Sequence, residues 1–236
     1  MLKILSLNIR SGGGRRIESL LRYIERQRPD AVVLTEWRQN SCSRIIIQWA
    51  NSCGLHHACL NDSGTSNGVF FAASSSFSYN SITPDNSSAG VLMNVTSGDW
   101  CMLASYFPQG SAKAAFFAAC HDAAKERADF PFAIIGDFNT GNQLHDRDNN
   151  GERYACAEKF DALSSKLNLS DLWRRTNGVS AREWSWKSNA GNGFRIDHAF
   201  ANQKFIDRYH PSCHYDHEPR ELGSTDHSAL IVTCMK

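Results

Sequence analysis

The sequence contains eight cysteines but no CxxC pair. They stand at positions 42, 53, 59, 101, 120, 156, 213 and 234, and no group of them has the spacing of a zinc finger. Cys59, Cys101 and Cys234 lie in apolar runs, where a free cysteine packs like a small hydrophobic residue. We therefore expect reduced cysteines in a cytoplasmic protein rather than a disulfide framework. A secreted chain that has lost its signal peptide is the alternative.

Long apolar runs are also missing. The apolar run in the N-terminal stretch MLKILSLNIRS is too short for a signal peptide, and no apolar stretch approaches the length of a transmembrane helix. Linkers, low-complexity tracts and internal repeats are absent from the sequence as well. With 236 residues, of which 42% are hydrophobic, the chain can build a sizeable core. We expect one catalytic domain over residues 1–236, a monomer, and no membrane partner.

Basic residues are absent from a long central stretch. Residues 45–112 contain no Lys or Arg, no Glu, and only three Asp. Residues 1–30, in contrast, carry seven Lys or Arg against three acidic residues, although the net charge of the whole chain is only +1. A polyanion would therefore meet the N-terminal helix or the C-terminal half of the chain.

Strand-like and helix-like patterns alternate along the chain. Apolar residues at helical spacing predict helices at 15–27, 44–53, 112–128 and 153–167. Apolar or alternating runs predict strands at 3–9, 30–36, 56–60, 68–74, 90–96, 100–107, 132–138, 194–201 and 227–234. This mixture of consecutive strands and crossover helices predicts an α/β (α+β) fold with two mixed β-sheets packed face to face and helices outside.

Polar residues that are able to take part in catalysis or metal binding stand where these strands end. Asp and Asn at such places are often turn formers, but Glu36 favours neither a strand nor a turn. Strand ends along one edge of a sandwich converge, so we expect a single acidic pocket. Its residues are Asn8, Glu36, Tyr106, Asp137, Asn139, Asp197, Asp226 and His227.

Such a pocket suits a hard divalent cation and a phosphate. Mg²⁺ or Mn²⁺ takes oxygen ligands, and Mg²⁺ uses only one or two carboxylates together with water. Cleavage of a phosphoester requires charge neutralisation, a water molecule aimed in line, and stabilisation of the leaving oxygen. A carboxylate can orient the water, and a histidine held by a carboxylate can donate to the phosphate.

Six motifs in order, LNIR, LTEW, SYFPQG, GDFNTG, FRIDHAFA and STDH, resemble the endonuclease/exonuclease/phosphatase superfamily. The stretches SYFPQGS and WSWK resemble its exonuclease III / apurinic-apyrimidinic endonuclease branch, and the resemblance runs from residue 4 to residue 232. It implies a four-layer αββα sandwich and a divalent-metal-dependent phosphodiesterase. The implied substrate is DNA, and the implied activity is an endonuclease or exonuclease of the abasic-site repair type. Tyr106 favours this branch, whose members resemble it in carrying a catalytic Tyr there, because deoxyribonuclease-I-like members and sphingomyelinases carry His at that position.

The resemblance also implies roles for the pocket residues. Glu36 would bind the metal directly, with Asn8 supporting it and Asp226 contributing. Asp137 would align the attacking water, and Asn139 would hold the phosphate. Asp197, Tyr106 and His227 complete the implied catalytic set, in which Asp226 orients His227.

Further residues are candidates for substrate binding. The resemblance places an aromatic residue at Trp186, and another near Phe194, in a pocket for an extruded deoxyribose; core packing is the equal alternative for Trp186. Arg174, Arg175 and Arg182 form a basic cluster that could contact DNA phosphates, with a solvated loop as the alternative.

Two other functions compete with the DNA reading. The first is a phosphatase or phosphodiesterase for a small or lipid-like phosphate ester, which the absence of basic residues from 45–112 and the short loop at 187–193 favour. The second is a non-catalytic binding module, which the complete polar set disfavours. His198 is expected to be a partly exposed strand residue, and residues 145–151 a polar surface loop.

Overall fold

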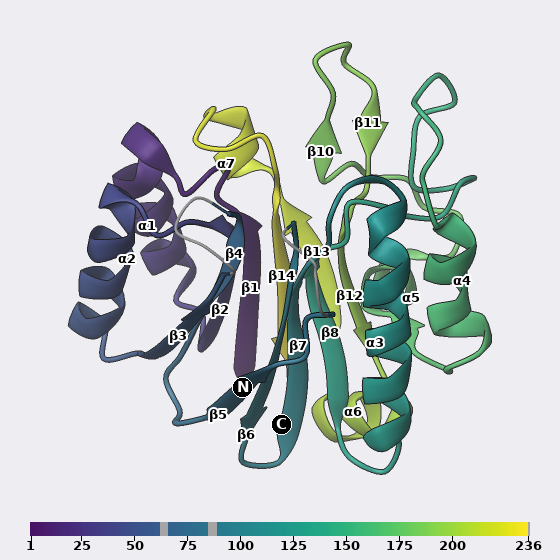
Figure 1. The fold of residues 1–236 in the computed structure, drawn as a ribbon, viewed down its shortest axis with the longest axis horizontal. Coiled ribbons are helices and arrows are strands. Elements are labelled where there is room, and N and C mark those ends of the chain that lie inside the picture. The colour runs from purple at the N-terminus through teal and green to yellow at the C-terminus, as the bar shows by residue number, and fades with distance from the viewer. Residues whose placement is uncertain (62–65, 85–88, 236) are drawn as a thin grey trace.

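The computed structural model describes residues 1–61, 66–84 and 89–235, and its strands form two six-stranded sheets and a two-stranded ribbon (Figure 1). The first sheet has the order β13-β14-β1-β2-β4-β3. Its strands are β1 (Leu2–Asn8), β2 (Ala31–Trp37), β3 (His56–Leu60), β4 (Gly68–Ala73), β13 (Ser212–Asp216) and β14 (Ala229–Cys234). β1 and β2 are parallel, so both deliver their carboxyl ends, at Asn8 and Glu36, to one edge of the sheet.

The second sheet has the order β5-β6-β7-β8-β12-β9. Its strands are β5 (Ser78–Ser81), β6 (Val91–Ser97), β7 (Trp100–Tyr106), β8 (Phe132–Asp137), β9 (Ser170–Asp171) and β12 (Asp197–Ala201). β7 and β8 are parallel and pair Tyr106 with Asp137 at their carboxyl ends. β12 runs the other way and begins opposite that point, since Asp197 pairs with Asp137.

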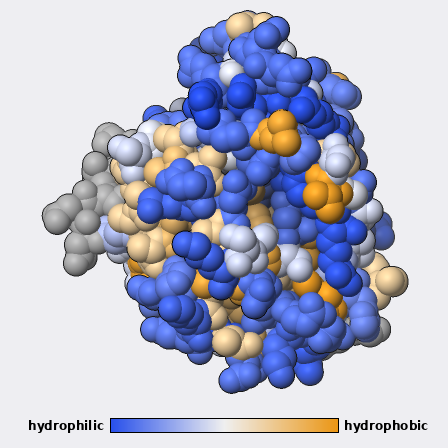
Figure 2. All heavy atoms as spheres, turned by 90° about the vertical axis from the view of Figure 1, so that its right-hand side faces the viewer, coloured by the Kyte–Doolittle hydropathy of each residue, from blue (hydrophilic) through white to orange (hydrophobic). Residues whose placement is uncertain are grey.

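Helices cover the outer faces of the two sheets. α1 (Ile17–Gln27) and α2 (Ser41–Ser52) lie on one side, and α3 (Lys113–Glu126) and α4 (Ala157–Ser165) lie on the other (Figure 1). One apolar cluster fills the space between the sheets, and two more lie beneath the helices. The arrangement is the expected four-layer αββα sandwich. The surface that carries α3 and α4 is largely hydrophilic, with apolar side chains in small groups (Figure 2).

Short elements gather at one edge of the sandwich. The ribbon of β10 (Trp186–Lys187) and β11 (Gly193–Phe194) projects there, beside α7 (Glu218–Glu221) (Figure 1). Two further helices are α5 (Leu172–Asn177) and α6 (Gln203–Tyr209), and two 3₁₀ turns are η1 (Gly14–Arg16) and η2 (Gly110–Ala112). None of the helices within the described ranges has both the length and the apolar character to cross a bilayer.

The sequence-based elements agree with the long strands and helices, but not everywhere. α4 begins at Ala157, so residues 153–156 are not helical as predicted. Arg153, Tyr154 and Ala155 instead line a cavity. β13, the ribbon and α5 to α7 are too short or too irregular to produce a clear period in the sequence.

Candidate active site

Asn8 links the two sheets at the edge of the sandwich. Its side-chain nitrogen donates to Oε1 of Glu36, 3.1 Å away in the same sheet, and to Oδ2 of Asp137, 2.9 Å away in the other sheet. Its side-chain oxygen accepts from the backbone nitrogen of Arg10 at 2.8 Å. Asn8 is buried, so these bonds fix the first three members of the predicted pocket relative to one another.

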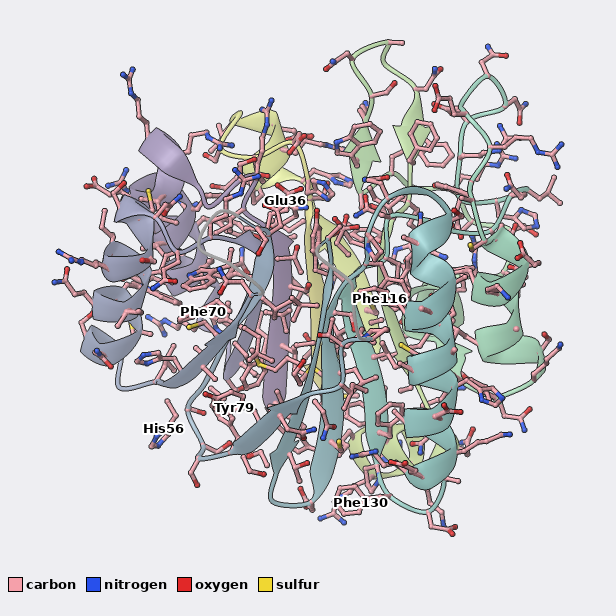
Figure 3. All side chains as sticks on the ribbon, in the orientation of Figure 1. Glu36, His56, Phe70, Tyr79, Phe116 and Phe130 are labelled. Atoms are coloured by element: carbon pink, nitrogen blue, oxygen red, sulfur yellow. The ribbon has the colours of Figure 1, made fainter. Side chains whose placement is uncertain are left out.

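Glu36 stands on a β-bulge. The register between β2 and β4 shifts between Thr35 and Trp37, and Glu36 itself has a φ of 56°. The bulge places the Glu36 side chain at the strand edge between the two sheets (Figure 3), where it lines a cavity. Its other carboxylate oxygen accepts from the backbone nitrogen of Ser11 at 2.7 Å.

The GDFN turn brings Asp137 and Asn139 together. A Cβ on Gly136, whose φ is 150°, would lie 1.9 Å from the Ser105 carbonyl oxygen, so only glycine allows β8 to approach β7 so closely. Asn139 adopts a left-handed φ of 51°, and its backbone nitrogen donates to Oδ1 of Asp137 at 2.8 Å. The carboxylate is thereby held on both oxygens, by Asn139 and by Asn8.

Asp197 and His227 form a buried pair beside this turn. Nδ1 of His227 lies 2.8 Å from Oδ2 of Asp197, and both side chains are almost fully buried. The hydroxyl of Tyr215 donates to the Asp197 backbone oxygen at 2.5 Å, which anchors the start of β12. The pair resembles in form the carboxylate–histidine arrangement that fixes an imidazole's orientation.

Asp226 and Tyr106 stand at the margins of the cluster. Oδ2 of Asp226 accepts from Nε1 of Trp186 at 3.1 Å and lies 3.8 Å from Nε of Arg10. The resemblance implied that Asp226 orients His227. Among the described contacts the imidazole of His227 has its hydrogen bond with Asp197, and Asp226 has one with Trp186 instead. The Tyr106 hydroxyl accepts from the side chain of Asn67 at 2.9 Å.

Electrostatics couple the buried groups. Burial, and next the carboxylate of Asp197, raise the pKa of Asp137 to about 7. Burial opposes the charged form of His227, but Asp197, with Asp137 and Asp226, raises the pKa of that imidazole well above its ordinary value. Burial, together with Glu36 and Asp137, raises the pKa of the Tyr106 hydroxyl, so this group is neutral at physiological pH.

A cavity of about 430 Å³ adjoins the cluster. Four members of the predicted pocket line it: Glu36, Asn139, Asp226 and His227. The other lining residues are Gln109, Gly110, Lys113, Glu152, Arg153, Tyr154, Ala155, Trp186, Phe194 and Ile196. The rings of Trp186 and Phe194 are 5.6 Å apart, and those of Tyr154 and Phe194 are 5.8 Å apart. The lining of the cavity thus combines polar and aromatic side chains, a combination that suits a phosphate attached to a sugar or a base.

The donor chemistry fits a divalent cation. Glu36 and Asp226 offer carboxylate oxygens to the cavity, and Asn8 lies behind Glu36. Asp137, Asp197 and His227 offer a second set, because one ligand atom from each lies within 4.8 Å of the others. In that second set the Nδ1 of His227 is already engaged with Asp197, whereas the Glu36 carboxylate accepts only from uncharged donors among the described contacts. The oxygen-rich first set therefore suits Mg²⁺ or Mn²⁺ better.

The predicted arginine cluster is divided by the structure. Arg174 has a side chain only 12% exposed, and it pairs with Asp146 and donates to the Val179 carbonyl oxygen. It is therefore part of a buried ion-pair network and does not offer its charge to a substrate. Arg175 and Arg182 are exposed, and Arg182 donates to the Leu144 backbone oxygen at 2.8 Å.

The sequence analysis did not predict this buried ion-pair network, and its predictions for residues 145–151 and for His198 were wrong. Arg195 is fully buried and makes two hydrogen bonds to the carboxylate of Asp146 and two to that of Asp171. The expectation that 145–151 is merely a polar surface loop was wrong, because Asp146 within it is fully buried. His198 was also misplaced: it is fully buried and lies 2.8 Å from the Thr140 carbonyl oxygen. The alternation of charge with apolar residues in FRIDH was the one available signal.

Comparison with solved structures gives the same architecture over the entire chain. The 3′ phosphatase NExo from Neisseria, solved with a product DNA hairpin, has a TM-score of 0.85 and 19% identity, and all of both chains is covered. The 3′-5′ exonuclease NExo from Neisseria meningitidis has a TM-score of 0.84 and 18% identity, again with full coverage of both chains. The chain has the endonuclease/exonuclease/phosphatase fold.

An AP endonuclease from Archaeoglobus fulgidus is also similar, with a TM-score of 0.81, 18% identity and full coverage of both chains. No protein-family model matches the sequence, and no curated protein matches it. At these identities the likeness establishes the fold, including the two-sheet sandwich that the sequence motifs implied.

Proposed function

We propose that the protein is a divalent-metal-dependent phosphodiesterase that hydrolyses DNA. One observation carries the proposal: Asn8, Glu36 and Asp137 of two different sheets are hydrogen-bonded into one cluster, beside the Asp197–His227 pair and at the mouth of a cavity. The similar solved proteins named above act on DNA or are named as DNA-processing enzymes, which supports the choice of substrate.

In this proposal Glu36 holds the metal, Asn8 supports it, and Asp226 contributes an oxygen. A bound Mg²⁺ or Mn²⁺ would neutralise the phosphate charge and favour a nucleophilic water molecule. Asp137 aligns that water, since both of its oxygens are fixed by neighbouring amides. Asn139 donates to the phosphate, because a side-chain amide has two N–H groups and only one is used on the Phe107 oxygen.

His227 lines the same cavity as Asn139 and would donate to a phosphate oxygen as an imidazolium held by Asp197. Tyr106 stays protonated and can donate its hydroxyl proton in a hydrogen bond towards the phosphate region. Trp186 and Phe194 form the wall for the sugar next to the scissile bond. We assign the finer activity to the abasic-site repair type, and removal of a 3′-terminal group is the competing form of the same chemistry.

The test is a hydrolysis assay of the purified protein with Mg²⁺, with Mn²⁺ and with EDTA. The substrates are abasic, 3′-phosphate-ended and undamaged DNA duplexes, together with a small aromatic phosphodiester. Metal-dependent cleavage of the abasic duplex at the lesion is the expected result. Preference for the 3′-phosphate end would replace the abasic specificity, and efficient turnover of the small ester alone would support the small-phosphate alternative. Failure to cleave any of them with either metal would refute the enzyme proposal.

A further inference from the structure

The segment from Phe107 to Lys113 holds Asn139 at three points. The Asn139 side-chain nitrogen donates to the Phe107 oxygen at 2.8 Å, and the Gln109 side chain donates to the Asn139 side-chain oxygen. The ammonium of Lys113 donates to the Asn139 backbone oxygen at 2.5 Å. The backbone N–H of Asn139 donates to Asp137, so among the described contacts the polar atoms of Asn139 are all engaged and only the second N–H of its side-chain amide is left for a substrate.

Lys113 occupies an unfavourable position for a lysine. It is the first residue of α3, where the positive end of the helix dipole disfavours a cation, and it is only 2% exposed. Burial lowers the pKa of its ammonium, while Asp137 and Cys156 oppose that shift. A buried ammonium costs folding free energy unless it is well compensated. The described hydrogen bond that compensates it is the one to Asn139.

The Asn139 carbonyl points at Lys113 because of its unusual backbone. A left-handed φ of 51° reverses the chain directly after Asp137, so the backbone oxygen faces α3 while the side chain remains at the cavity. An asparagine tolerates this conformation, but nothing intrinsic to it holds one orientation of the following peptide group. A charge-assisted hydrogen bond from a buried ammonium supplies that constraint.

We propose that Lys113 is a positioning residue for phosphate cleavage, which acts by holding Asn139 in the orientation that presents its free N–H to the substrate. The proposal rests on the function proposed above, and it extends the catalytic set to a residue on a helix outside the strand-end motifs. In this proposal the buried ammonium of Lys113 costs folding free energy, and its hydrogen bond to Asn139 keeps the phosphate site rigid.

The first test is a double-mutant cycle with Lys113→Met and Asn139→Ala. Methionine keeps the length of the apolar stem and removes the ammonium. Loss of a group that orients a functional residue typically costs about 10- to 100-fold, so Lys113→Met should lower kcat by about that factor with little change in KM. In the Asn139→Ala background the same substitution should have almost no further effect, because the side-chain N–H that Lys113 is proposed to position is gone, although the backbone oxygen that accepts from Lys113 remains. Lys113→Arg should recover part of the loss.

Stability separates a positioning role from a structural one. The thermal midpoint of Lys113→Met should equal or exceed that of the wild type, because a buried cation at a helix N-terminus is removed. Lys125→Met, exposed near the end of the same helix, is the matched control and should change neither kcat nor the midpoint. Loss of activity that accompanies loss of stability would overturn the proposal.

A measurement without turnover distinguishes this proposal from the proposed function. The side-chain amide signals of Asn139, identified by their loss in Asn139→Ala, should shift or broaden in ¹H–¹⁵N spectra of Lys113→Met and remain in place in Lys125→Met. Unchanged signals, or additive effects on kcat in the cycle, would refute the role of Lys113. If the wild type cleaves no phosphoester with any metal, the proposed function fails and the spectra still decide whether Lys113 holds Asn139.

Discussion

Nδ1 of His227 lies 2.8 Å from the carboxylate of Asp197, and this pair joins a loop before β14 to the first residue of β12. β14 and β12 belong to different sheets, so the contact between the two side chains depends on the packing of the whole sandwich. The arrangement fixes which imidazole nitrogen faces the carboxylate and leaves the other nitrogen for the cavity side.

Asp197→Asn tests this pair. The substitution preserves shape but removes the charge that stabilises the imidazolium, so kcat should fall by about 10² or more, with a small effect on KM. Steady-state kinetics on the preferred substrate measure both. Asp216→Asn is the control, because Asp216 accepts from Tyr23 and Gln27 away from the cavity; it should leave kcat unchanged. A wild-type kcat in Asp197→Asn would show that the pair is only structural.

Glu36→Gln tests the metal site. The amide has one acceptor oxygen, so it keeps the hydrogen bond from Asn8 or the one from Ser11, and it loses the charge that a divalent cation requires. Activity at fixed Mg²⁺ should fall by orders of magnitude, and the Mg²⁺ concentration for half-maximal activity should rise. A titration of activity with Mg²⁺ measures this. Turnover by either form in excess EDTA would contradict the role given to Glu36.

Arg182→Ala tests contact with DNA beyond the cavity. If Arg182 neutralises one phosphate, the slope of log K against log salt should decrease in magnitude by about one unit. Salt titrations of duplex binding by the wild type and the variant measure the slope. Arg174→Ala should instead lower thermal stability, because it leaves Asp146 with fewer partners in a buried network. An unchanged slope for Arg182→Ala would remove this residue from the interface.

Trp186 has two roles that two substitutions can separate. Trp186→Ala removes both the aromatic wall and the hydrogen bond to Asp226, so it should reduce discrimination for abasic over intact DNA. Trp186→Phe removes the hydrogen bond and keeps a ring against Phe194, so discrimination should survive. The ratio of kcat/KM values on the two duplexes is the measurement. Equal losses in both variants would attribute the effect to Asp226 rather than to the wall.

The buried His198 should make the stability of the folded protein depend on pH. Burial, and next the positive charge of Arg195, lower its pKa to about 4, whereas the unfolded chain has an ordinary histidine pKa near 6.5. The unfolded state therefore binds more protons between these values, and stability decreases as pH falls from about 6.5 towards 4. The loss is on the order of 3 kcal/mol. In His198→Phe this part of the acid limb should be absent in urea titrations at several pH values. If the free energy of unfolding of His198→Phe decreases with falling pH as steeply as that of the wild type, His198 is not the source of this pH dependence.

The sequence was enough to expect that the strand-end residues would lie near one another, because each lies at or near the end of a strand with a clear apolar pattern. The parallel pairs β1–β2 and β7–β8 then bring Asn8, Glu36, Tyr106 and Asp137 to one edge. That convergence follows from sheet topology, and the order of motifs was enough to infer it.

The charged interior could not be predicted in the same way. Arg195 is paired with Asp146 and Asp171, which lie 49 and 24 residues away in the sequence. A local pattern treats each of these residues as solvated, because burial of a charge becomes acceptable only when distant partners meet it. The same reason explains why Arg174 and Lys113 were not recognised as buried.

The bulge at Glu36 interrupts the ladder between β2 and β4, and it also brings the Glu36 carboxylate to the cavity. A regular ladder would continue from Thr35 to Trp37 if the chain were one residue shorter, and a glycine would adopt the φ of 56° with less strain. Both changes would favour a stable sheet, and both would delete the carboxylate. Any redesign of this chain that optimises the fold alone will therefore tend to erase its chemistry at this one position.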